Sequence, residues 1–203
     1  MMDDISIINE FKRIISVESQ AVSSLSTSVD GEVFCTLVQT IAECRGRVLL
    51  SGCGTSAQAA KKIAHSLCCI ERPASFLAPS DSVHGGLGFL QKDDIIILIS
   101  KGGNTEELVK MIPACKKKGA TLVSVTENEN SVIAKEADIF VKVKIQREPD
   151  EFNMLATAST MAVIAVFDAV CITLMKYMGY KREQFAIIHP SGAVGDRLLG
   201  GLK

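Results

Sequence analysis

Five short apolar runs, separated by longer stretches of another character, constrain the fold of this chain most strongly. They lie at residues 48–50, 75–77, 95–99, 122–125 and 139–143. Amphipathic or alanine-rich stretches with a helical period lie between most of them. Continuous apolar strands that alternate with helices are typical of a parallel sheet covered on both faces. The sequence therefore predicts an α/β fold, a three-layer doubly wound parallel sheet of five strands, with ligands bound at the carboxyl ends of the strands.

Helical periodicity flanks this core on both sides. Residues 4–43 show one apolar face that contains Ile5, Ile8, Phe11, Ile14 and Ile15, and a second apolar face near the end of the segment. The Ser/Thr-rich residues 23–28, with Asp-Gly at 30–31, predict a break between two helices. Two closing helices are expected over 155–179 and 190–199. We expect a single domain over 1–203, with N-terminal helices in 1–46 and the core with the C-terminal helices in 47–203.

Composition excludes several classes of function. The chain has 22 Lys and Arg against 23 Asp and Glu, a net charge of −1, which gives no electrostatic footprint for nucleic acid. The longest apolar stretch, 161–175, contains Asp168 and is shorter than the roughly 20 residues that span a membrane. No secretory signal is expected in the Met-Met-Asp-Asp start. The seven scattered cysteines and three separated histidines predict free thiols in a reducing cytoplasm and no metal site.

Two loops of one design could bind a phosphate group. Residues 51–56, Ser-Gly-Cys-Gly-Thr-Ser, and residues 100–105, Ser-Lys-Gly-Gly-Asn-Thr, each follow an apolar strand and open a helical stretch. Glycines allow a tight turn, and the free amides of a helix N-terminus attract anions. Neither loop matches a P-loop or a dinucleotide fingerprint, so simple capped turns are the alternative. Two such loops together favour a sugar phosphate held by hydroxyls and amides.

Four isolated side chains are candidates for proton transfer or substrate contact, and each has an ordinary alternative. Glu107 forms the spacing of a capping box with Asn104, which would tie its carboxylate to the backbone. His84 lies in a glycine-rich loop, where a histidine is usually solvated. Glu148 lies in a charged stretch that is typical of a solvated loop. His189 precedes a helix-starting proline and has the pattern of a half-buried structural histidine.

Taken together, these segments resemble the sugar isomerase (SIS) domain family, in particular the SIS domain of the arabinose 5-phosphate isomerases. The motifs that carry the resemblance are Ser51-Gly52-x-Gly54-x-Ser56, His84-Gly85-x-Leu87-Gly88, Ile99-Ser100-x-x-Gly103 and His189-Pro190-x-Gly192-Ala193-x-Gly195. They extend from about residue 47 to 199. The resemblance implies a flavodoxin-like sandwich and an isomerisation between an aldose phosphate and a ketose phosphate without a cofactor. Such chemistry needs a base for a carbon-bound proton and donors that stabilise the enediolate.

The resemblance also implies roles for individual residues. Glu107, Glu148 and His189 fall on three of four catalytic positions, and which glutamate is the base stays open. The substrate-binding positions implied by the resemblance or by the loops are Ser51, Gly52, Thr55, Ser56, His84, Ser100, Lys101, Gly103 and Thr105.

The chain departs from the family pattern at one catalytic position. Thr55 stands where the isomerases have a lysine, and a hydroxyl supplies no positive charge. Lys101, in the second loop, is a candidate source of an ammonium near the same pocket. Many of these isomerases also carry a pair of CBS modules after the SIS domain. This sequence contains no counterpart of them, so we expect no nucleotide control through such modules.

Two functions follow from the resemblance. The first is a phosphosugar isomerase that interconverts D-arabinose 5-phosphate and D-ribulose 5-phosphate. The alternative is a sensor that binds a sugar phosphate without turnover, which Thr55 favours and which the retention of both glutamates and His189 disfavours. SIS domains pair, and the apolar helices exceed what one small sheet can cover, so we expect a homodimer or homotetramer. The expected ligand is a sugar phosphate, with no nucleic-acid or membrane partner.

Overall fold

The computed structural model describes residues 2–190 of the 203-residue chain. The strands are β1 (Val48–Gly52), β2 (Ala74–Phe76), β3 (Ile95–Ile99), β4 (Thr121–Thr126) and β5 (Ile139–Lys142). The helices are α1 (Asp4–Ser28), α2 (Gly31–Glu43), α3 (Gly54–Cys68), α4 (Pro79–Ser82), α5 (Glu106–Val109), α6 (Ile112–Lys118), α7 (Val132–Glu136), α8 (Ala158–Tyr177) and α9 (Arg182–Ile188), with a 3-10 turn at Gly86–Phe89.

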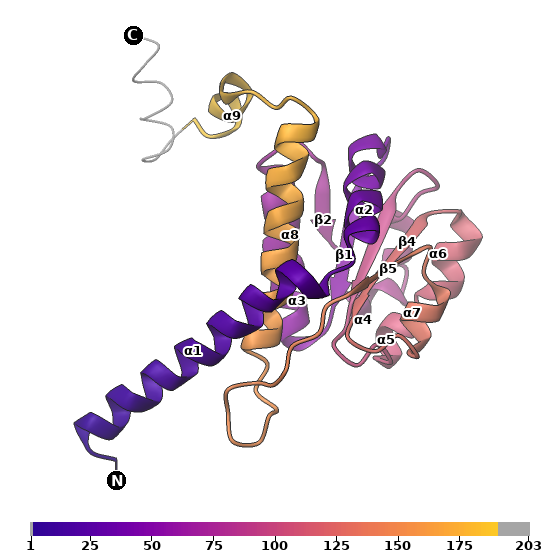
Figure 1. The fold of residues 1–203 in the computed structure, drawn as a ribbon. Helices are drawn as coiled ribbons and strands as arrows, with labels where there is room; N and C mark the ends of the chain where they lie inside the picture. The colour runs from indigo at the N-terminus through magenta and orange to yellow at the C-terminus, as the bar shows by residue number, and fades with distance from the viewer. Residues whose placement is uncertain (1, 191–203) are drawn as a thin grey trace.

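The five strands form one parallel sheet in the order β2-β1-β3-β4-β5 (Figure 1). This strand order is that of a flavodoxin-like doubly wound sheet, and the α/β prediction is confirmed. Strand β1 lies next to β3, in a register that places Gly52 opposite Ile99. The loops that follow β1 and β3 therefore leave the same edge of the sheet side by side.

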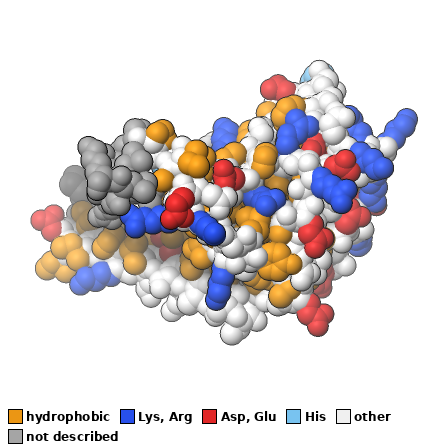
Figure 2. Space-filling model, turned by 90° about the horizontal axis from the view of Figure 1, so that it is seen from above, with side chains coloured by type: hydrophobic (Ala, Val, Ile, Leu, Met, Phe, Trp, Pro, Cys, Tyr) orange, Lys and Arg blue, Asp and Glu red, His pale blue; other side chains and the backbone are white. Residues whose placement is uncertain are grey.

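Helices cover both faces of the sheet, as the continuous apolar strands require. Alternate strand residues such as Leu50 and Ile97 pack with α1, α2, α3 and α8. The other set, which includes Leu49 and Leu98, packs with α5, α6 and α7. Burial on both sides explains why these strands show no polar alternation. On the face shown in Figure 2, lysines and arginines are interspersed with acidic side chains.

The break between the first two helices lies later than the Ser/Thr-rich segment predicts. Helix α1 continues through residues 23–28 to Ser28, because the hydroxyls of this segment donate back to carbonyls one turn earlier, as from Ser24 to Ala21. The chain turns at Val29, and the Asp30 carboxylate accepts the amides of Glu32 and Val33 to begin α2. The predicted helix break is therefore real but displaced.

Much of the predicted apolar face of α1 lies in solvent. The N-terminal half of α1 projects away from the body of the protein (Figure 1), and Phe11 is 62% exposed. Ile5, Ile8 and Ile15 are exposed with it. An amphipathic helix normally buries its apolar stripe against another element, so this face has no partner among the described residues.

The long helix near the C-terminus was expected over 155–179 and is α8. By length and composition alone α8 could cross a membrane. It instead packs on the sheet and against α3 through Phe167, Val170 and Leu174, as a core helix does. The second predicted closing helix, 190–199, lies outside the described residues apart from Pro190. Helix α9, which precedes it, was not predicted.

The N-cap of α2 allows a test of the turn at residues 29–30. Replacing Asp30 with Ala leaves the amides of Glu32 and Val33 without their carboxylate partner. We expect the free energy of unfolding to fall by about 1 kcal/mol, measured by urea denaturation. Thr27→Ala removes a hydroxyl that bonds only within α1, and we expect it to leave stability unchanged. Equal stability of the two variants would contradict the capping role of Asp30.

Candidate active site

Four of the predicted binding residues lie where β1 ends and α3 begins. Gly52 lies so close to the backbone of Ser56 and Ile99 that a side chain would collide with them. Gly54 has a φ of +56°, which glycine adopts without strain, and begins α3. Ser51 is fully buried, and its hydroxyl donates to the carbonyl of Leu77 at 2.7 Å. The Ser51 hydroxyl therefore joins two strand ends, while Thr55 and Ser56 line the adjacent pocket.

The loop after β3 is organised by its own hydroxyls. The Ser100 Oγ accepts the Gly103 amide at 3.0 Å and lies 2.8 Å from the Thr105 Oγ1. Gly103 has a φ of +72° and lies against Ser131, so a larger residue would meet both strain and a collision. The predicted residues of this loop therefore form one compact turn before α5.

Glu148 is buried, and the expectation of a solvated loop is wrong for it. Its side chain is 0% exposed. One carboxylate oxygen accepts the Lys101 ammonium at 2.8 Å, and the other accepts the amides of Thr157 and Ser159 at the start of α8. A helix N-terminus stabilises a negative charge. The charged stretch was misleading because Glu148 points inward while its charged neighbours Arg147 and Glu151 are exposed.

The protonation state of Glu148 follows from these contacts. Burial raises the pKa of the carboxyl group, but the bond from Lys101 and those from Ser159 and Thr157 outweigh it. The pKa therefore lies below its ordinary value, and the group is a carboxylate at neutral pH.

Glu107 differs from Glu148 in almost every respect. It is exposed, and its carboxylate accepts no hydrogen bond from the described residues. The capping box with Asn104 is not formed, because the Asn104 side chain accepts the amide of Val132 instead. Burial raises the pKa of the Cys53 thiol, and the negative charge of Glu107 raises it further, so Glu107 lies near the loop after β1. Glu107 thus presents an exposed side chain from α5 near the loop after β1.

A small pocket of about 80 Å³ lies where these loops meet α8. Its lining is rich in hydroxyls, from Thr55, Ser56, Thr126, Ser159 and Thr160. Of its lining residues, Lys101 alone is charged. Sequence reasoning missed the last three hydroxyl residues. The signal for Thr126 was its place at the end of an apolar run, and that for Ser159 and Thr160 was a Ser/Thr pair at the start of a long apolar helix.

The two predicted histidines are not in this pocket. His84 is exposed after α4, which packs against α5, the helix of Glu107. His189 ends α9, where its ring stacks on Phe185 with centroids 4.0 Å apart and Nδ1 lies 3.1 Å from the Phe185 carbonyl oxygen. Helix α9 lies beyond the far end of α8 from the Glu148 loop (Figure 1). Since α8 has 20 residues, its two ends are about 30 Å apart.

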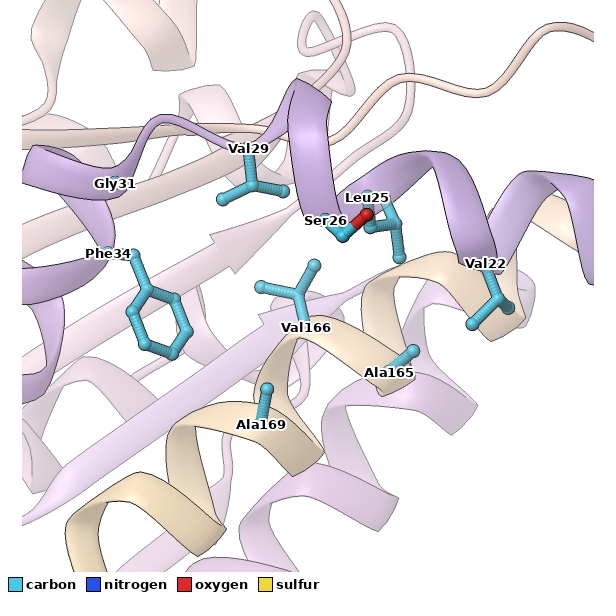
Figure 3. A pocket seen from close by; sticks show the side chains of 9 residues that line it. All are labelled: Val22, Leu25, Ser26, Val29, Gly31, Phe34, Ala165, Val166 and Ala169. Atoms are coloured by element: carbon cyan, nitrogen blue, oxygen red, sulfur yellow. The ribbon is translucent and has the colours of Figure 1, made fainter.

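A larger groove elsewhere has no chemistry of its own. It has a volume of about 420 Å³ and lies between α8 and the α1–α2 turn (Figure 3). Val22, Val29 and Phe34 face the small side chains Ala165 and Ala169 across it. No titratable side chain lines it, so it cannot transfer protons. The described residues also contain no cluster of three or more groups that could hold a metal ion.

Comparison with known proteins identifies the family of this fold. Residues 40–173 match the SIS domain family. The chain belongs to the SIS domain family. The resemblance inferred from the motifs is therefore confirmed, and the matched segment contains both loops, Glu107 and Glu148.

Relatives of this SIS domain are named as isomerases. Arabinose 5-phosphate isomerase KdsD of Pseudomonas aeruginosa is 35% identical over 98% of this chain and 61% of its own length. Arabinose 5-phosphate isomerase KpsF of Escherichia coli is 33% identical over 95% of this chain and 59% of its own length. The chain thus spans about three fifths of these curated relatives.

Two solved structures resemble the chain over nearly its whole length. A Listeria monocytogenes protein described as a candidate sugar-phosphate isomerase has a TM-score of 0.93 and 59% identity, covering 94% of this chain and all of its own. An Escherichia coli protein solved in complex with arabinose 5-phosphate has a TM-score of 0.89 and 31% identity, covering 93% of this chain and all of its own.

The buried Glu148 carboxylate should make the stability of this domain depend on pH. Because its folded pKa lies below the ordinary value of 4.5, its contribution is present above pH 4.5 and is lost as the pH falls through the folded pKa. We expect Glu148→Gln to lower the free energy of unfolding by about 1–3 kcal/mol at pH 7, with a difference that narrows below pH 4.5. Urea denaturation of both proteins from pH 7 to pH 3 measures this difference in the free energy of unfolding.

The matched control for this test is Glu129→Gln. Glu129 also pairs with a lysine, Lys142, but on the surface, so we expect little change at any pH. A Glu148→Gln deficit that stays constant from pH 7 to pH 3 would contradict the assignment of the charge to Glu148.

Proposed function

We propose that this SIS domain is an aldose–ketose isomerase of phosphosugars, acting on D-arabinose 5-phosphate and D-ribulose 5-phosphate. The observation that carries the proposal is a pair of unlike carboxylates. Glu148 is buried and ionised, and its partners Lys101 and Ser159 line a pocket rich in hydroxyls. Glu107 is exposed and lies near Cys53, which precedes Thr55 and Ser56 of that pocket. A site that only binds a phosphate has no need of either carboxylate. The names of the relatives and the arabinose 5-phosphate complex of the Escherichia coli protein support the substrate.

The two carboxylates differ in how well each can act as the base. Glu107, without hydrogen-bond partners among the described residues, is the better base, and it takes the proton from C2 of the open-chain aldose. The electron pair left at C2 forms the C1=C2 bond, and the carbonyl pair moves to O1 as an enediolate. Transfer of the O2 hydroxyl proton to O1 and return of a proton to C1 complete the ketose. The Lys101 ammonium and the hydroxyls of the pocket provide donors for the charge on oxygen.

The phosphate is assigned to the two loops and the start of α8. Thr55 and Ser56 open α3, a helix of 15 residues, and provide hydroxyls beside its free amides. Ser100, Gly103 and Thr105 form the facing turn. No cofactor or metal enters the proposed reaction, because proton transfer next to a carbonyl needs only a base and donors.

Proton NMR in D2O with D-arabinose 5-phosphate tests this function directly. We expect ketose formation with deuterium at C1 of the ketose, and deuterium at C2 of aldose that re-forms, since an abstracted proton exchanges with solvent. We expect Glu107→Gln to reduce the rate about a hundredfold or more while the sugar still binds. The control is Glu106→Gln, at the neighbouring exposed glutamate that pairs with Lys110, and it should keep full activity. A wild-type protein that shows no exchange and forms no ketose would contradict the proposal.

A sensor function is the second candidate, and Thr55 is the observation that favours it. Without a lysine at this position, the loop after β1 contributes no positive charge. Line broadening of the sugar signals without exchange at C2 would support the sensor over the isomerase. The buried Glu148 carboxylate disfavours a sensor function, because a second negative charge does not help to bind a phosphate group.

We also propose that the active unit is a cytoplasmic homodimer or homotetramer. The exposed apolar face of α1 and the apolar groove of Figure 3 offer surfaces for a second copy. His189 is about one α8 length from Glu148 within one chain. A catalytic role for His189 therefore requires that it act in the site of a neighbouring subunit.

Mixing two inactive variants tests the shared site. Glu148→Gln and His189→Ala are each expected to be inactive alone. Co-refolded in equal amounts, they should regain a fraction of wild-type turnover, because some sites then combine an intact Glu148 with an intact His189 from the neighbour. A mixture of Glu148→Gln with Glu107→Gln is the control, since both lie in one chain's own loops near the same pocket, and it should regain none. Activity of His189→Ala alone at the wild-type level would exclude His189 from catalysis.

A further inference from the structure

The two side chains of the Lys101–Glu148 ion pair differ strongly in their exposure to solvent. The two groups are 2.8 Å apart, and the Glu148 side chain is fully buried while that of Lys101 is 38% exposed. Both oxygens of Glu148 are engaged, one by Lys101 and the other by the first amides of α8. Lys101 therefore has one side against a fixed carboxylate and another toward the pocket, which it lines.

Lys101 is itself held in place from the neighbouring strand. Its backbone carbonyl accepts the Thr126 hydroxyl at 2.8 Å and the Glu127 amide at 3.1 Å. Both donors lie at the carboxyl end of β4. A lysine side chain is flexible, but here contacts hold both the backbone and the ammonium of Lys101. Little conformational entropy therefore remains to be lost when a ligand binds.

Other charged groups surround Glu148 but do not neutralise its carboxylate. Arg147, next to it, donates to the backbone carbonyls of Glu148 and Asp150. Arg13 of α1 donates to the carbonyl of Pro149. The Asp150 carboxylate accepts amides of its own loop. From the start of α8 come the amides of Thr157 and Ser159 and the Ser159 side chain, none of which carries a charge. Lys101 is therefore the single cation that reaches the carboxylate among the described residues.

We propose that Lys101 is a positioning residue of this site, which holds the Glu148 carboxylate oriented and ionised beside the bound sugar phosphate. The ammonium thereby restores the positive charge that Thr55, lining the same pocket, does not supply. This inference rests on the proposed isomerase function. It extends that function by assigning Lys101 an effect through Glu148, separate from direct contact with the substrate.

The direct test is a carbon-13 NMR titration of the Glu148 carboxyl group without any sugar, with the signal assigned by its loss in Glu148→Gln. In Lys101→Gln, a donor remains but the charge is gone, so we expect the titration midpoint of Glu148 to rise. Lys101→Arg keeps the charge and should keep the midpoint low. Lys110→Gln is the control, since Lys110 pairs with exposed Glu106 one turn along the surface, and it should leave Glu148 unchanged. An unchanged midpoint in Lys101→Gln would overturn the proposal.

Kinetics then connect the pair with turnover. We expect Lys101→Gln to lower kcat roughly tenfold to a hundredfold with a smaller change in KM, and to move the acidic limb of the pH profile to higher pH. Lys101→Arg should recover most of kcat, and Lys110→Gln should match the wild type. A normal kcat and acidic limb in Lys101→Gln would overturn the proposed role. A wild type without turnover would instead overturn the isomerase function, while the titration would still decide the state of Glu148.

Discussion

A carboxylate with no access to solvent must be satisfied by the protein, and this requirement on Glu148 links the parts of the site. The group follows β5, accepts two amides from the start of α8 and pairs with a lysine that follows β3. Removing any one of these partners leaves a charge in a medium that stabilises it poorly. The loop after β3, the end of β5 and the long helix α8 are therefore held in one arrangement by a single side chain.

The parallel sheet decides where this arrangement can be built. All five strands run in the same direction, so every strand-to-helix loop leaves from one edge. The pattern of apolar runs was sufficient to predict this edge, because strands buried on both faces have no polar alternation. The two Ser/Gly/Thr loops followed from the same pattern, since each lies at the end of a run. The strands and the two loops could thus be predicted from local sequence patterns, namely the periodicity of apolar residues and the residues that favour turns.

What the sequence could not provide was the direction in which individual side chains point. Glu148 lies among charged neighbours and is nevertheless buried, because its partners at residues 101, 157 and 159 are distant or ordinary in sequence. The capping spacing of Asn104 and Glu107 was equally misleading, since Asn104 has a better partner in Val132 across the loop. The Ser/Thr segment of α1 failed as a helix breaker because its hydroxyls bond within the helix. In each case a tertiary or competing hydrogen bond decided between local alternatives.

The adjacency of β1 and β3 also explains how a lysine on the second loop reaches the pocket that Thr55 lines. Gly52 and Ile99 are opposite each other at the ends of these strands, and residues 55 and 101 line the same small pocket. A cation offered from either loop consequently reaches the same volume. Electrostatic stabilisation depends on where a charge lies and not on which loop carries it. Lys101 therefore supplies the cation of this pocket, and the buried carboxylate of Glu148 keeps its ammonium in place.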